Sequence, residues 1–176
     1  MSYQLLDAGA RVQETVPLVV QEGRVIRGPS GDRLQVERET RHPTLEGVEV
    51  TQAQTFINER RTLVVSYNSH EPPGTLGYAV VVRPGCSVGD HYHHRREERI
   101  LLLHGQAEFR LQDQRPSSSS YERMNVFTLD YPGACVRVPT GVAHTVLADG
   151  ALAVLQVLAS TDYDPDDDVR VVLSAL

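Results

Sequence analysis

The most restrictive feature of this sequence is a long series of short segments rich in β-branched and aromatic residues, separated by Gly, Pro, Asn and Asp. From about Val48 these segments follow one another closely, and none has a helical period over three turns. Such segments are typical of strands and turns. Parallel strands would need amphipathic crossover helices, and the sequence offers none. The pattern therefore predicts an all-β sandwich or barrel rather than an α/β fold.

Ten segments are expected to form the strands of one barrel. The first 46 residues hold three further strand-like fragments, at 15–20, 24–27 and 33–38. We therefore divide the chain into an N-terminal extension, 1–46, and a barrel, 47–176. Barrels of this kind associate through edge strands, so we expect a homodimer and assign the extension to extra strands or to the dimer contact. The expected strands are 47–56, 62–67, 78–83, 90–94, 99–103, 107–112, 124–129, 134–138, 143–148 and 151–159.

Composition narrows the expected partners. The chain has 176 residues, a usual length for one domain, and a formal net charge of -6 at pH 7. Its Lys and Arg residues are scattered, whereas phosphate neutralisation needs them clustered, so nucleic acid is not an expected partner. We find no signal peptide pattern and no stretch of about 18 apolar residues, so no membrane partner is expected. These observations predict a soluble, cytoplasmic protein that acts on a small molecule.

Two further features are predicted to be structural. Cys86 and Cys135 lie in apolar segments without a metal-type Cys-x-x-Cys pair, so both are expected to be buried thiols. An acidic run at 162–168 lacks the glycine and the distal glutamate of an EF-hand loop. It is therefore expected to be a solvated turn before a last apolar segment at 169–173.

The residues that carry chemistry concentrate in the segment 85–105. His91 and His93 alternate with Tyr92, and alternate side chains of a strand share a face, so the two imidazoles are expected to lie together. A short turn through 94–97 would reverse the chain. Glu98 would then lie beside the two histidines at the start of the next strand.

A second segment supplies a further candidate ligand. Pro139 and Gly141 predict a turn that delivers His144 into an apolar strand. The candidate ligands of one divalent transition metal are therefore His91, His93, Glu98 and His144. Three neutral imidazoles and one carboxylate suit Zn, Fe, Ni, Mn, Co or Cu, whereas a dedicated calcium site would need more oxygen ligands. The alternative is a hydrogen-bonded network of the same side chains without a metal.

These two segments resemble the paired motifs of the cupin superfamily. The first motif is Gly, five residues, His-x-His, four residues, Glu, six residues and Gly, and 85–105 matches it. The second is Gly, five residues, Pro-x-Gly, two residues and His, and 133–144 matches it, with Ala148 where the motif usually closes with Asn. The resemblance implies a double-stranded β-helix, the jelly-roll barrel of cupins, with the metal in its mouth.

Around these motifs the chain is similar to the cupin domains of nucleotide-sugar 3-epimerases and 3,4-ketoisomerases. The stretches that carry the likeness are 56–63, 89–100, 105–110, 138–144 and 157–165. In the first of them Arg61 stands where those enzymes have Gly. The resemblance implies an enzyme that epimerises or isomerises a nucleotide-linked 4-keto-6-deoxy sugar through an enolate. The alternatives are a metal-dependent dioxygenase acting on a small molecule and a non-catalytic small-molecule-binding cupin.

Residues for catalysis and substrate binding are predicted from side-chain chemistry and from their place near loops that would border the mouth. The candidate bases are His94 and His70, and the candidate acids are Tyr131, Tyr78 and Tyr67. The candidates for binding a nucleotide diphosphate through bidentate hydrogen bonds are Arg60, Arg83 and Arg110. Glu108 is expected to be a surface partner for such charges.

Overall fold

The computed structural model describes residues 44–58, 60–67 and 74–173, and it is built almost entirely of strands. Among these residues the single helical element is a short 3₁₀ turn, η1 (Pro165–Asp167), and no helix in them is long and apolar enough to span a membrane. The strands are β1 (Glu49–Gln52), β2 (Thr55–Asn58), β3 (Arg61–Val64), β4 (Leu76–Val82), β5 (Cys86–His93), β6 (Glu98–His104), β7 (Ala107–Asp113), β8 (Met124–Leu129), β9 (Ala134–Val138), β10 (Val142–Ala148), β11 (Ala153–Ala159) and β12 (Asp168–Arg170).

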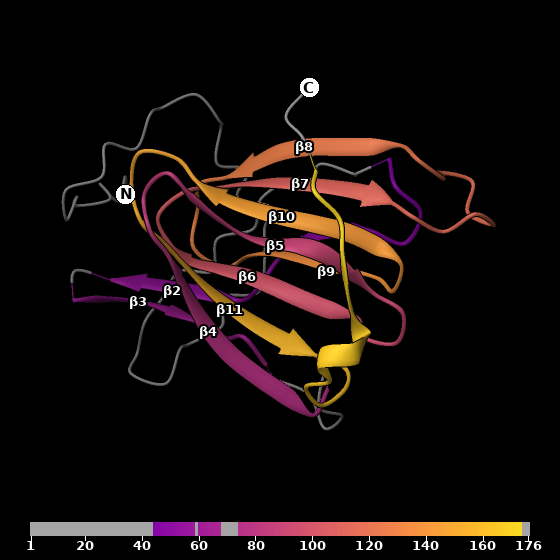
Figure 1. Ribbon diagram of the computed structural model, residues 1–176. Coiled ribbons are helices and arrows are strands. Elements are labelled where there is room, and N and C mark those ends of the chain that lie inside the picture. The colour runs from indigo at the N-terminus through magenta and orange to yellow at the C-terminus, as the bar shows by residue number, and fades with distance from the viewer. Residues whose placement is uncertain (1–43, 59, 68–73, 174–176) are drawn as a thin grey trace.

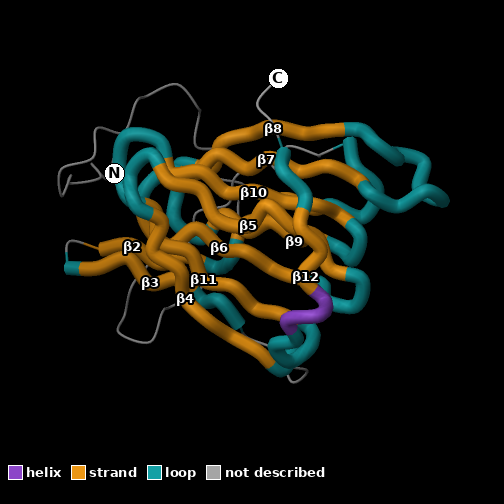
Figure 2. Tube along the Cα trace, viewed as in Figure 1, coloured by secondary structure: helices purple, strands orange, loops and turns teal. Residues whose placement is uncertain are grey.

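Two five-stranded antiparallel sheets form the two layers of the barrel (Figures 1 and 2). One sheet has the order β1-β9-β6-β11-β4 and the other has the order β12-β5-β10-β7-β8, while β2 and β3 form a separate hairpin. Consecutive strands such as β5 and β6 lie in different sheets, so the chain crosses repeatedly between the layers. This is the jelly-roll arrangement. The prediction of an all-β jelly-roll barrel is confirmed.

Alternating side chains fill the space between the sheets. Strands β7 and β11 bury every second residue, as the period of a strand with one solvated face requires. Phe109 and Leu155 lie on these buried faces, and the Phe109 ring stacks on Phe127 at 5.7 Å between centroids. Full burial of one such side chain contributes about 1.5 to 3 kcal/mol. An apolar core of this kind fixes the registers that position the polar residues described below.

Most expected strands occur within a few residues of their predicted bounds, and the differences have local causes. The expected strand at 47–56 is broken in two. The backbone N–H of Ala53 donates to Gly133 O, the ladder between β1 and β9 ends there, and β2 pairs with β3 instead. Strand β5 starts earlier than expected because Cys86 pairs with Ala148 of β10. Cys86 is therefore exposed and its predicted burial is wrong, whereas Cys135 is buried as predicted.

The N-terminal extension falls almost wholly outside the described residues, and with it the fragments 15–20, 24–27 and 33–38. Its assignment to extra strands or to a dimer contact stays a prediction. At its described end, Leu45 packs in the barrel core and the Glu46 carboxylate accepts hydrogen bonds from Ser118 and Ser119. Thr44 also exchanges hydrogen bonds with Asn125 of β8, so all the described residues at this end contact the barrel.

A buried carboxylate organises the turn after β7. The side chain of Asp113 is fully buried, and its Oδ2 accepts hydrogen bonds from Ser118 Oγ and Ser120 Oγ, each at 2.6 Å. The Arg115 guanidinium donates to both of its oxygens, at 2.8 and 2.6 Å. Burial alone would raise the pKa of Asp113, but these donors hold it well below its ordinary value of 3.8.

Replacement of this carboxylate by an amide, Asp113→Asn, should lower the free energy of unfolding by about 2 to 4 kcal/mol, because buried donors lose a charged acceptor. The contribution of Asp113 is complete above pH 3.8, its ordinary pKa, and is lost as the pH falls through its lowered pKa. Urea titrations at several pH values should show that the difference in unfolding free energy between wild type and variant becomes smaller below pH 3.8. The exposed Asp149→Asn is the control, and equal losses in both variants would contradict the prediction.

Candidate metal centre and active site

The strand registers bring the four predicted ligands to one end of the barrel. His91 of β5 lies directly opposite His144 of β10 in the antiparallel ladder. His93 follows on the same face of β5, and the turn 94–97 then carries the chain to the facing sheet, where β6 begins at Glu98. Both sheets therefore contribute donors. The four side chains lie close together in this geometry, and their role as metal ligands stays a prediction.

The three imidazoles form a compact group. One ring nitrogen from each of His91, His93 and His144 lies within 4.8 Å of the others, and the ring centroids are 4.6 to 5.8 Å apart. Glu98 contacts two of the three, with Oε1 3.6 Å from His93 Nε2 and Oε2 3.3 Å from His144 Nε2. Donors around a shared zinc ion lie about 3 to 4 Å apart, since each bond is about 2.1 Å long. Small side-chain rotations are enough to reach that spacing.

Both nitrogens of two rings face oxygen atoms of the protein. His93 Nδ1 lies 3.2 Å from the backbone oxygen of Asp167 and 3.1 Å from a carboxylate oxygen of Asp168, while His144 Nδ1 lies 3.4 Å from Val142 O. The Nε2 atoms of the same rings face the Glu98 carboxylate, and His93 Nε2 is buried without a hydrogen-bond partner. A metal ion on Nε2 would leave the ring proton on Nδ1, where oxygen acceptors are present.

The surroundings of Glu98 carry more negative than positive charge. Glu98 is 2 % exposed, and it shares the buried guanidinium of Arg96, at 3.9 Å, with Asp168, at 3.8 Å. Two carboxylates against one guanidinium leave negative charge in a region of low dielectric, which attracts a cation. Three imidazoles and one carboxylate are the donor set of a transition-metal ion. The residues present therefore fit a divalent metal.

The pKa shifts in the group follow from burial and from contact with Glu98. Burial alone would lower the pKa of His93, but the Glu98 carboxylate raises it above its ordinary value of 6.5. Burial, together with the imidazoles of His144 and His93, lowers the pKa of His91 to about 4, so this ring is neutral at physiological pH. Burial alone would raise the pKa of Glu98, but the imidazoles of His144 and His93 hold it below its ordinary value of 4.5. A neutral imidazole and an ionised carboxylate are the forms that bind a metal.

A β-bulge aims the two opposing histidines. The β5–β10 register shifts between His144 and Thr145, where Gly89 and Asp90 both have positive φ, of 99° and 57°. Thr145 Oγ1 donates to Asp90 Oδ1 at 2.7 Å, which fastens the bulge next to His91. Bulges that redirect a side chain are common beside functional sites.

Comparison with known proteins places this barrel in a family. A family model described as the polysaccharide biosynthesis C-terminal domain matches residues 58–168, which is more than half of the chain. The chain belongs to this family. Among curated proteins the sequence of this polysaccharide biosynthesis domain finds no match.

Solved structures of sugar epimerases and isomerases share the fold of this polysaccharide biosynthesis domain. The dTDP-4-dehydrorhamnose 3,5-epimerase of Elizabethkingia anophelis has a TM-score of 0.61 at 17% identity, over 74% of this chain and 78% of that one. The dTDP sugar isomerase of Desulfovibrio desulfuricans has a TM-score of 0.66 at 18% identity, over 73% and 85%. NovW, a 4-keto-6-deoxy sugar epimerase of Streptomyces spheroides, has 0.65 at 19% identity, over 77% and 75%. The predicted cupin resemblance is confirmed at the level of the fold.

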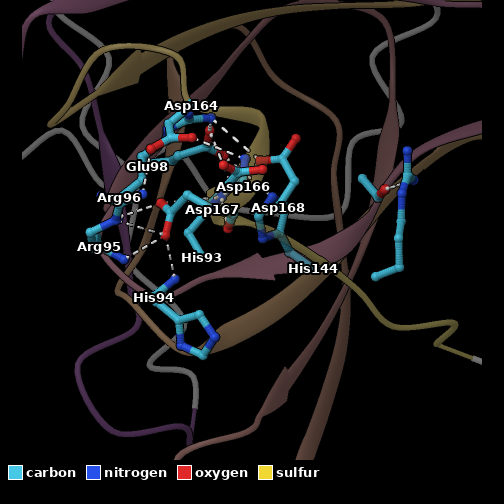
Figure 3. Close-up of polar contacts among 12 residues, drawn as sticks. His93, His94, Arg95, Arg96, Glu98, His144, Asp164, Asp166, Asp167 and Asp168 are labelled. Atoms are coloured by element: carbon cyan, nitrogen blue, oxygen red, sulfur yellow. Dashed lines mark hydrogen bonds and ion pairs between the residues drawn. The ribbon is translucent and has the colours of Figure 1, made fainter.

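The structure brings one predicted catalytic residue of the domain to the centre. The hydroxyl of Tyr78, on edge strand β4, donates to Glu98 Oε1 at 3.1 Å, and burial and the Glu98 carboxylate raise the pKa of Tyr78 above its ordinary value of 10.0. His94 is next to the ligands in sequence, but its ring packs edge-on against Tyr92 and points away from the cluster (Figure 3). The catalytic roles of both stay predictions.

The other candidates lie elsewhere or outside the described residues. Tyr131 packs near the far end of β6 from Glu98, since Gly133 N donates to Leu102 O. Arg83 lies in the turn between β4 and β5, and Arg110 is paired with Glu108 at 2.7 Å, as expected for that glutamate. Arg60 is exposed in the β2–β3 turn and Tyr67 is exposed after β3, whereas His70 lies outside the described residues. The roles of these residues stay predictions.

Three residues of the site were missed because long-range pairing places them there. Asp167 is 2 % exposed, so the predicted solvated turn is wrong at this position: its carboxylate accepts the backbone N–H groups of the turn 94–96 at 3.0 to 3.1 Å. Asp168 and the buried Arg96 complete the surroundings of His93 and Glu98 (Figure 3). The acidic composition of 162–168 was visible, but no local signal joins it to the His-x-His segment.

Substitution of the bulge glycine, Gly89→Ala, should lower the free energy of unfolding. The loss should exceed the one caused by placing an alanine at a positive φ without any steric contact. A Cβ at this position would lie 2.5 Å from the backbone oxygen of His144, whereas one at Gly150, with φ of 71°, would meet nothing within 4 Å. Gly150→Ala should therefore cost about 1 kcal/mol of unfolding free energy and Gly89→Ala clearly more. Chemical denaturation measures both values, and equal losses would contradict the role given to the bulge.

Proposed function

We propose that this domain is a metal-containing epimerase or isomerase of a nucleotide-linked 4-keto-6-deoxy sugar. The observation that carries the proposal is the group of three imidazoles and one carboxylate at one end of the barrel, with one ring nitrogen of each histidine within 4.8 Å of the others. Support for the substrate class comes from the fold, because structures that share it are titled as epimerases and isomerases of such sugars.

The proposed ligands of the metal are His91, His93, Glu98 and His144. When bound, a divalent cation would supply Lewis-acid polarisation of a carbonyl. The identity of the metal within the set Zn, Fe, Ni, Mn, Co and Cu stays open, because the same donors suit each of them. Arg96 lies beside these candidate ligands. Its guanidinium is near the carboxylates of Glu98 and Asp168, and no substrate is needed for these contacts.

The chain's own part in the reaction is to move a proton at the carbon next to the ketone. A base removes that proton, the electron pair passes into an enolate, and reprotonation from the opposite face inverts the carbon. We assign the second step to the Tyr78 hydroxyl, because it contacts Glu98 while 36 % of the side chain remains exposed. His94 and His70 stay the candidates for the base, Tyr131 stays an alternative acid, and Arg60, Arg83 and Arg110 stay the candidates for the nucleotide.

The proposal includes a cytoplasmic homodimer. Strand β4 is an apolar seven-residue edge strand with Val81 exposed, and an unprotected edge of this kind is suited to pairing with a second copy. The dioxygenase and binding-module alternatives use the same four ligands, but the structural neighbours favour the epimerase.

Removal of the carboxylate ligand, Glu98→Gln, should abolish tight metal binding. The adjacent Glu97→Gln is the control, because Glu97 pairs with Arg137 at 2.8 Å instead of meeting the histidines. Elemental analysis should find one metal per chain in wild type and in Glu97→Gln. Competition with a chromophoric chelator should show the affinity of Glu98→Gln reduced by more than about 100-fold, beyond the loss typical of outer partners. Equal affinities in the two variants would exclude Glu98 as a ligand.

Loss of the proposed acid, Tyr78→Phe, should separate proton removal from inversion. Wild type incubated with a nucleotide-linked 4-keto-6-deoxyhexose in deuterated water should incorporate deuterium beside the ketone and form the epimer. The variant should still exchange the proton with retention, while epimer formation falls by about 100-fold or more. Nuclear magnetic resonance follows both signals in one sample.

The control for this experiment is Tyr121→Phe, an exposed tyrosine in the loop after β7. It should exchange and invert at wild-type rates. Absence of deuterium uptake by wild type across several such sugars would refute the epimerase, and oxygen consumption with bound iron would support the dioxygenase instead. Inversion at the wild-type rate by Tyr78→Phe would remove only the assignment of the acid.

A further inference from the structure

The side of the metal centre that faces the C-terminal segment is built from protein carboxylates. In the ladder between β12 and β5, Asp168 lies directly opposite His93. Its Oδ1 is 3.1 Å from His93 Nδ1 and 3.8 Å from the Arg96 guanidinium, and this oxygen is buried without a hydrogen-bond partner, while Nδ1 faces Asp167 O at 3.2 Å. The Asp168 carboxylate is therefore placed between the outer nitrogen of one ligand and a buried positive charge.

We propose that Asp168 is a positioning residue for the metal centre, and that it couples metal binding to the docking of β12. This inference rests on the proposed metal centre. The carboxylate and the backbone oxygen of Asp167 would together hold the proton of His93 on Nδ1, which would direct the Nε2 lone pair to the metal and restrain rotation of the ring. Partners of this kind raise the basicity of a ligand imidazole.

The same C-terminal segment also forms hydrogen bonds with the turn 94–97, which joins His93 to Glu98. Asp167 Oδ1 accepts from the N–H groups of His94 and Arg95, and its Oδ2 accepts from that of Arg96. Its backbone oxygen also faces His93 Nδ1 at 3.2 Å. The turn 94–97 sets where Glu98 enters the facing sheet, so η1 and β12 fix two ligands at once.

The coupling follows from the shortness of β12. This strand has three residues and lies at the edge of its sheet, next to β5 alone. Few ladder pairs therefore hold it, and the contact between Asp168 and His93 adds to the Asp167 hydrogen bonds in its attachment. A metal ion on Nε2 would polarise the ring and make its Nδ1–H a stronger donor to Asp168. Metal binding should thus stabilise β12, and β12 should in turn stabilise the metal.

The first test compares metal affinity among three variants of the full chain, with zinc ions as the probe and a chromophoric chelator as competitor. Asp168→Ala should bind zinc about 10- to 100-fold more weakly than wild type, as expected for loss of an outer partner. Asp168→Asn should recover most of that loss, because its amide oxygen still accepts from Nδ1. The control is Asp166→Asn, in the same segment but with an exposed side chain, and it should bind as wild type does.

The second test reads the coupling itself through hydrogen exchange. The amide of Val171 donates to Asp90 O at 2.9 Å just beyond β12, so its exchange rate reports the docking of this segment. Zinc should slow that exchange in wild type and in Asp168→Asn. In Asp168→Ala it should leave the rate unchanged even when zinc saturates the centre.

Each outcome separates this inference from the function on which it rests. Zinc binding by Asp168→Ala at the affinity of Asp166→Asn, or wild-type protection of Val171 in Asp168→Ala, would overturn the positioning role while the metal centre stands. No zinc binding by wild type would overturn both. Tight zinc binding without turnover of any sugar would refute the epimerase alone, because neither measurement involves a substrate. If Asp168→Ala fails to fold, the zinc affinities of Asp168→Asn and Asp166→Asn are compared instead. A zinc affinity of Asp168→Asn below about one tenth of that of Asp166→Asn would contradict the acceptor role of the amide.

Discussion

The position of β5 between β10 and β12 is the constraint on which the site depends. One neighbour sets His144 opposite His91, and the other sets Asp168 opposite His93. Side chains in a strand alternate with a period of two, so a slip of one residue on either side would turn a ligand or its partner to the other face. The bulge at Gly89 absorbs the one irregularity in this ladder and keeps both pairs aligned. The arrangement of side chains in the centre therefore depends on strand register. The packing of the apolar core stabilises that register.

Buried charge is concentrated in this region for a reason that stability alone does not supply. Glu98, Arg96 and Asp167 are each at most 3 % exposed, and burial of such groups is costly unless they are paired and hydrogen-bonded. Asp167 meets this condition through three backbone N–H groups. Glu98 meets it only in part, through a hydrogen bond from the Tyr78 hydroxyl, a guanidinium at 3.9 Å and two imidazole nitrogens at 3.6 and 3.3 Å. In our proposal a metal cation would complete the neutralisation of Glu98, since apolar residues of equal volume would serve the fold as well.

The sequence was sufficient to predict the fold class and the four candidate ligands because both rest on short sequence patterns, while the ligand role itself stays a prediction. Alternating apolar segments and turn residues predict strands, and His-x-His with a nearby Glu predicts side chains that share a face. The partners Asp168 and Arg96 could not be predicted from the sequence, because their positions depend on long-range pairing rather than on a local pattern. Asp168 lies 75 positions after His93 and meets it only through the pairing of β12 with β5. Nothing adjacent to Arg96 distinguishes it from Arg95, yet one side chain is 3 % exposed and the other 62 %. The exposed Cys86 shows the same limit, because an apolar segment does not reveal where a strand begins.

The separation between the two ends of β6 explains how one barrel can vary its chemistry without losing its fold. Glu98, at the start of the strand, meets the histidines, while Ile100 and Leu102 are buried among apolar side chains of both sheets. Changes among the residues that surround Glu98 would alter the reaction and leave that packing in place. Shared folds at low sequence identity are expected under this division, because the core conserves register and the polar end is free to diverge. A residue such as Tyr78, which comes from an edge strand and touches the centre through a single hydrogen bond, is therefore better placed to determine the reaction than any residue of the core.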